Sequence, residues 1–173
     1  MAGAKVIVHG DIGVGKSTAV RAAMERLGWE KPGGFFTHWD GRGRGAEVLW
    51  IETWTGEKRP MAHRIARPAA PGGPAYALEP DFPVVALRAL ADADSGRPVV
   101  IDELGLIELG APGFEAAVAK LFRGPAPVLA VVQFRALDRW LGAIGPENAA
   151  VLLRADAATR AALPGKIAAL FRA

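Results

Sequence analysis

A glycine-rich segment near the N-terminus has the clearest potential for chemistry. It reads GDIGVGKST from Gly10 to Thr18, which fits the pattern G-x-x-x-x-G-K followed by Ser or Thr. Glycines at these spacings let successive backbone N–H groups curl around phosphate oxygens. Lys16 should reach the β- and γ-phosphates of a nucleotide, while the Ser17 hydroxyl should bind Mg²⁺. The predicted nucleotide contacts are Gly10, Asp11, Ile12, Gly13, Val14, Gly15, Lys16, Ser17 and Thr18.

Two adjacent carboxylates form a second candidate group. Asp102 and Glu103 directly follow an apolar run from Pro98 to Ile101, which is typical of a buried strand. An acidic residue at the end of such a strand completes the Mg²⁺ shell in P-loop proteins, so we assign Asp102 to the metal. A glutamate in the next position polarises the attacking water in some NTPases, whereas many nucleotide kinases do not need one. Glu103 therefore favours hydrolysis over transfer of the γ-phosphate to a second substrate.

Alternating strands and helices must position these residues. A strand over Lys5–His9, the glycine loop and a helix over Ser17–Leu27 open a βαβ unit. The other predicted strands cover residues 35–39, 47–54, 61–65, 98–103, 128–133 and 149–153, and the other helices cover residues 81–93, 113–122, 137–141 and 157–171. This order indicates an α/β fold with a three-layer, mostly parallel sheet and an antiparallel insertion between residues 35 and 65. We expect one domain over residues 1–173.

Prolines and acidic residues set several expected boundaries. Residues 67–80 are rich in proline and glycine, so they are predicted to form an exposed loop, either a passive connector or a lid. Asp81 is expected to cap the helix that follows. Pro164 falls inside the last predicted helix and would divide it.

Composition excludes several other kinds of chemistry. The chain has 173 residues and no cysteine, so it has no disulfide, thiolate zinc site or cysteine nucleophile. Its net charge of +3 is carried by scattered arginines and gives only a weak indication of nucleic-acid binding. The apolar run at the N-terminus is too short for a signal peptide, and no run approaches the roughly 20 residues that span a bilayer. The sequence therefore predicts a cytoplasmic protein that is not bound to a membrane.

Four segments together resemble one known family, the thermophile-type nucleoside-triphosphatases. Gly10–Thr18 matches the phosphate-binding loop of that family, and Gly34–Thr37 (GFFT) matches its G-F-x-T strand. Val100–Leu109 (VIDELGLIEL) resembles its signature, which begins I-D-E and ends E-L and is the most specific of the four. Leu163–Ile167 (LPGKI) resembles the L-P-x-x-I near its last helix. The resemblance spans nearly the whole chain.

The resemblance implies a RecA-like core and slow, rather unselective hydrolysis of nucleoside triphosphates to diphosphates. It gives Lys16 and Ser17 to the phosphates and Mg²⁺, Asp102 to the metal, and Glu103 to the attacking water. The family also has a basic hairpin after G-F-x-T, and Arg44 is the nearest match to its arginine, with Arg42 as second choice. Such an arginine would stabilise charge on the γ-phosphate. The hairpin departs from the family pattern, because His38-Trp39-Asp40 follows the threonine and Gly45-Ala46 replaces a G-F pair.

Two further polar residues and two further activities stay open. Gln133, at the end of a predicted strand, could sense the γ-phosphate or orient water, and Glu108 could brace the loop after the carboxylates. The same core could instead be a kinase that phosphorylates a nucleoside, a nucleotide or an RNA end. It could also be a nucleotide-dependent binding switch whose slow turnover resets it. Stimulation of hydrolysis by nucleic acid or protein would favour the switch.

Overall fold

An eight-stranded sheet forms the centre of the molecule, in the order β5-β4-β3-β2-β6-β7-β1-β8. The computed structural model describes residues 3–40, 47–65, 75–148 and 150–173. The strands are β1 (Lys5–Gly10), β2 (Gly33–Trp39), β3 (Val48–Thr53), β4 (Lys58–Arg64), β5 (Tyr76–Leu78), β6 (Val99–Leu104), β7 (Val128–Gln133) and β8 (Val151–Arg154). The five neighbouring strands β2, β6, β7, β1 and β8 are parallel to one another. The strands β3, β4 and β5 extend the sheet beyond β2 by antiparallel pairing.

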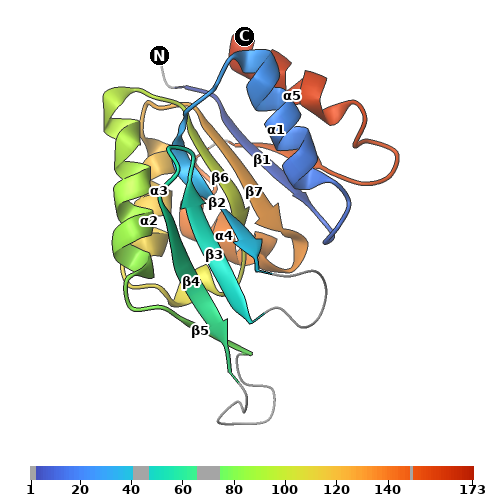
Figure 1. Cartoon of the computed structure of the whole chain (residues 1–173). Helices are drawn as coiled ribbons and strands as arrows, with labels where there is room; N and C mark the ends of the chain where they lie inside the picture. The colour runs from blue at the N-terminus through green and yellow to red at the C-terminus, as the bar shows by residue number, and fades with distance from the viewer. Residues whose placement is uncertain (1–2, 41–46, 66–74, 149) are drawn as a thin grey trace.

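Helices cover the sheet on two sides and make three layers (Figure 1). Helices α1 (Lys16–Leu27) and α5 (Leu163–Arg172) lie on one side, and α2 (Phe82–Ala91), α3 (Phe114–Arg123) and α4 (Leu137–Ile144) lie on the other. Each side has its own buried apolar cluster, one built around Val6 and Val8 and the other around Ile7. The predicted α/β class with an antiparallel insertion is confirmed. Among the described residues, none of the helices is long and apolar enough to cross a membrane.

The central parallel strands bring the candidate residues to one edge of the sheet. β7 lies between β1 and β6, with Gly10 of β1 opposite Gln133 of β7. On the other side of β7, Asp102 of β6 lies opposite Val131. The carboxyl ends of these strands therefore meet, and such an edge is where ligands bind in open α/β sheets.

The start of the last helix was predicted wrongly. The helix begins at Leu163 rather than residue 157, so Pro164 lies in its first turn and does not divide it. Proline is tolerated there because its missing N–H would have no partner within the helix. The residues before it form a turn in which Asp156 Oδ1 accepts the N–H groups of Ala158 and Thr159, at 2.9 and 2.8 Å.

Two smaller expectations also differ from the structure. The segment predicted as a loop contains the strand β5, which pairs with β4. This strand has only three residues, too few to show the alternation of apolar and polar residues by which a strand is recognised in a sequence. Asp81 does stand at the N-cap of α2, but its side chain forms no capping hydrogen bond.

Gly34 is fixed by a close approach of two strands. Its φ is +87°, and a Cβ atom there would overlap the carbonyl of Val100 on β6. Gly28, the C-cap of α1, has a similar φ of +69°, but a Cβ atom there would meet nothing within 4 Å. A side chain at Gly28 would therefore cause backbone strain alone, whereas a side chain at Gly34 would cause both backbone strain and a steric clash.

We expect Gly34→Ala to destabilise the protein more than Gly28→Ala. The Gly28 variant should lose about 1–2 kcal/mol, the strain of a left-handed alanine. The Gly34 variant adds the overlap with Val100 to that strain. Urea unfolding of both variants measures the difference, and equal losses would contradict the steric assignment.

Candidate active site

The phosphate-binding loop joins β1 to α1. Gly15 is the N-cap of α1 and has a φ of +95°, which an L side chain rarely adopts. Lys16 begins the helix, is 5% exposed, and donates hydrogen bonds from Nζ to the carbonyls of Gly10 and Asp11, at 2.9 and 2.8 Å. The first turn of α1 has no acidic residue, so its positive end is not neutralised. This loop has the geometry of an anion site.

Ser17 and Asp102 meet across the gap between α1 and β6. The Ser17 Oγ donates to Asp102 Oδ1 at 2.9 Å. Burial raises the pKa of Asp102 to about 6, and the hydrogen bond from Ser17 opposes that rise. Asp102 is 3% exposed, and a carboxylate buried to this degree is stabilised by a nearby cation.

These two oxygen ligands fit Mg²⁺. This ion prefers hard oxygen donors, keeps several waters and takes others from phosphate. In the part of the chain that the structure describes, no group of three or more His, Cys, Asp or Glu side chains could hold a metal alone. Ser17 and Asp102 would therefore hold Mg²⁺ together with the nucleotide rather than in a closed protein cage.

Glu103 is held between side chains from three other elements. Gln133 Nε2 at the end of β7 donates to Glu103 Oε1 at 2.7 Å. Glu103 Oε2 lies 3.7 Å from Lys16 Nζ, and the Glu103 N–H faces Thr37 Oγ1 on β2 at 3.4 Å. The glutamate side chain is 24% exposed, so solvent can reach it while the hydrogen bond from Gln133 orients it.

Two buried side chains, Glu108 and Trp140, hold the loop that follows β6 by hydrogen bonds to Gly105. Glu108 Oε2 accepts the Gly105 N–H at 2.9 Å, and Trp140 Nε1 on α4 donates to the Gly105 carbonyl at 2.9 Å. A Cβ atom at Gly105 would come within 2.9 Å of the Gln133 side chain. Glu108 thus contacts the loop in the way suggested from the sequence. The loop in turn packs against Gln133, the side chain that donates to Glu103.

The structure brings together four of the residues predicted from the sequence and adds others. Lys16, Ser17, Asp102 and Glu103 form one contiguous group. The proposed arginines, Arg44 and Arg42, lie outside the described residues. Sequence reasoning gave no role to Thr37, Trp140 or Arg135; their contacts with Glu103, Gly105 and Gln133 follow from topology and have no local motif.

Comparison with known proteins identifies the family. A model of the NTPase family matches residues 5–168. The chain belongs to this family. The predicted resemblance is therefore confirmed, and so is the prediction that the protein is a nucleoside-triphosphatase. Among relatives, nucleoside-triphosphatase THEP1 of Natranaerobius thermophilus is 30% identical over 138 residues, covering 76% of each chain. THEP1 of Methanosarcina barkeri is 29% identical over 174 residues, covering 97% of each chain.

Solved structures of other NTPases support the fold. THEP1 from Aquifex aeolicus superposes with a TM-score of 0.74 at 24% identity, covering 98% of this chain and 99% of that one. A human cancer-related nucleoside triphosphatase gives a TM-score of 0.76 at 24% identity, with 96% of each chain covered. These matches, with the sheet order, confirm the predicted P-loop NTPase architecture.

The buried Glu108 should make the stability of this NTPase depend on pH. Burial raises its pKa from 4.5 to about 7. Below pH 4.5 both folded and unfolded states are protonated, so the group has no effect. As pH rises to 7 the unfolded state loses the proton first, and stability falls by roughly 3 kcal/mol.

We therefore expect Glu108→Gln to gain stability relative to wild type as pH rises from 4.5 to 7. The glutamine keeps an acceptor for the Gly105 N–H but does not titrate. Urea unfolding of both proteins at the two ends of this range measures the change, and titration of Asp102 cancels in the comparison. A difference in stability that is the same at both ends would show that Glu108 is not buried as a neutral acid.

Proposed function

We propose that this protein hydrolyses Mg²⁺-bound nucleoside triphosphates to diphosphate and phosphate, with Glu103 as the general base. One observation carries this proposal: Glu103 is oriented by Gln133 at 2.7 Å and lies 3.7 Å from the ammonium of Lys16. A carboxylate fixed beside the lysine expected on the γ-phosphate is placed to take a proton from an attacking water. A kinase that uses an acceptor hydroxyl would need a second substrate in the same position.

The reaction assigns a separate task to each residue. Backbone N–H groups from Gly10 to Thr18 would hold the phosphates, and the Lys16 ammonium would leave the Gly10 and Asp11 carbonyls to bind β- and γ-phosphate oxygens. Bound Mg²⁺, held by Ser17 and Asp102, would neutralise charge on those oxygens. These contacts would stabilise the negative charge that shifts onto the γ-phosphoryl and bridging oxygens in the transition state.

The chemical step needs only the substrate and one water. The water oxygen forms a bond to the γ-phosphorus while Glu103 takes a water proton. The bond from the γ-phosphorus to the bridging oxygen breaks, and the diphosphate leaves with that oxygen. Gln133 would keep the glutamate carboxylate turned toward the water, which makes it a positioning residue in this scheme.

Glu103→Gln should retain nucleotide binding and lose hydrolysis. Removing a general base slows a reaction by about 10²–10⁴-fold, while the amide keeps the size and hydrogen-bonding capacity of the side chain. The measurement is phosphate release from ATP, GTP, CTP and UTP with Mg²⁺, together with binding of a fluorescent nucleotide. Wild-type turnover in the variant would remove Glu103 from the mechanism. Tight binding without release by the wild type would indicate a kinase or a switch instead.

Lys16→Ala should lose the binding of nucleotide itself. Its ammonium is the buried cation of the loop, and alanine leaves the loop without that charge. Lys120→Ala on α3 is the matched control, because it removes an exposed lysine on the far side of the sheet. Titration with the same fluorescent nucleotide measures both variants. Equal affinities for the Lys16 variant and the control would contradict the assigned role.

A further inference from the structure

One face of the inserted strands is left open by the described helices. Helices α1 and α5 pack over the parallel strands, whereas β3 and β4 extend past them with no described helix across this side (Figure 1). Alternation along β3 sends Leu49 and Ile51 into the core beneath and Trp50 to the opposite side. We call the side chains on the opposite side the open face; their mutual contacts and strand pairing join Arg21, Phe36, His38, Trp50, Glu52, Trp54 and Lys58.

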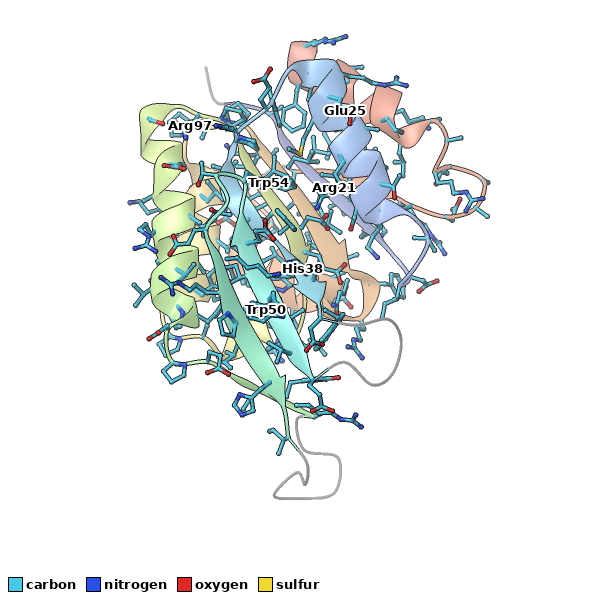
Figure 2. The ribbon with its side chains drawn as sticks, in the orientation of Figure 1. Arg21, Glu25, His38, Trp50, Trp54 and Arg97 are labelled. Carbon is cyan, nitrogen blue, oxygen red and sulfur yellow. The ribbon has the colours of Figure 1, made fainter. Side chains whose placement is uncertain are left out.

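Aromatic rings and cations alternate on the open face. The Arg21 guanidinium lies 4.6 Å from the Phe36 ring and 5.2 Å from the Trp54 ring, and these rings are 4.8 Å apart. Lys58 Nζ lies 4.8 Å from the Trp50 ring. Figure 2 shows Arg21, Trp54, His38 and Trp50 along this side of the molecule, from α1 to β3. Flat aromatic rings with neighbouring cations suit nucleobases and the phosphates that join them.

The charge on the open face is positive. Within the part of the chain that the structure describes, neither Arg21 nor Lys58 forms a salt bridge. The acidic residue of the face, Glu52, contacts His38 Nε2 at 3.1 Å. Arg21 lies close enough to Asp102 to lower the pKa of that carboxyl, so a phosphate beside Arg21 would also lie near the active site, whereas Lys58 is further along the face.

The open face adjoins the active site. Phe36 is paired with Asp102 in the sheet, and His38, two residues further along β2, is paired with Trp50. Trp50 therefore stands beyond the carboxylate end of β6. Arg21 lies one helical turn after Ser17 on α1. A chain bound along the face would pass the side of the site where Mg²⁺ and the γ-phosphate are expected.

We propose that the open face binds single-stranded nucleic acid, with one base stacked on Trp50 and the backbone phosphates beside Lys58 and Arg21. Trp54 lies in the turn just after β3, and its indole N–H donates to the Val100 carbonyl at 2.8 Å, so Trp50 is the ring assigned to the base. The small number of cations predicts modest affinity with little sequence preference. Binding through this face does not depend on which residue is the base for hydrolysis.

The test is the affinity of the full chain for labelled oligouridylate and oligothymidylate of about 12 nucleotides, by fluorescence anisotropy. Trp50→Ala should weaken binding about tenfold, from the loss of one stacked base. Trp39→Ala is the matched control, because that tryptophan packs on Tyr76 at 4.7 Å and points away from the open face. Far-UV circular dichroism and unchanged phosphate release establish that each variant is folded.

A second pair of variants tests the charge. Lys58→Gln should reduce the slope of log affinity against log salt by about 0.7, the value for one lost phosphate contact on a single strand. Lys120→Gln, with the same change of charge on α3, should leave both the slope and the affinity unchanged. Binding of RNA alone or DNA alone at Trp50 would support the proposal and identify the strand. No binding of either oligonucleotide, or equal losses in the Trp50 and Trp39 variants, would overturn it.

Discussion

The register of three parallel strands decides what can meet at the active edge of this sheet. β7 separates β1 from β6, so the phosphate loop and the carboxylate pair lie two strands apart. Gln133, at the end of the intervening strand, donates a 2.7 Å hydrogen bond to Glu103 on β6, and Lys16 of the phosphate loop lies 3.7 Å from the other oxygen of that glutamate. A shift of one residue in β7 would turn this glutamine to the other face of the sheet. The orientation of Glu103, the proposed general base, therefore depends on the pairing of β6 with β7.

Burial of two carboxyl groups near the site disfavours their charged forms. Asp102 and Glu108 are each 3% exposed, and burial is the largest cause of the raised pKa of both. A carboxylate in such a place disfavours its own charged form unless a partner offsets the loss of water. Ser17 and the Gly105 N–H supply hydrogen bonds, but the full compensation for Asp102 is expected from bound Mg²⁺.

The sequence predicted most of the fold and the part of the site that lies in continuous motifs. The glycine loop and the Asp102-Glu103 pair each sit at the end of a buried apolar strand, so their positions follow from local pattern. The contacts of Thr37, Trp140 and Arg135 join distant segments, and no local period reveals them. The start of the last helix was predicted wrongly because proline interrupts the interior of a helix but is tolerated in its first turn, where Pro164 lies. The single domain and the cytoplasmic location stay predictions.

We propose that Gln133 acts on hydrolysis by positioning Glu103, and a double-mutant cycle tests this coupling. The turnover of Gln133→Ala, Glu103→Gln and the double variant would be compared with wild type at saturating Mg²⁺–ATP. If the glutamine only positions the base, its removal slows the wild type but has no further effect once Glu103 is glutamine. Rate losses that multiply in the double variant would contradict the account, because they would show that the two side chains act independently.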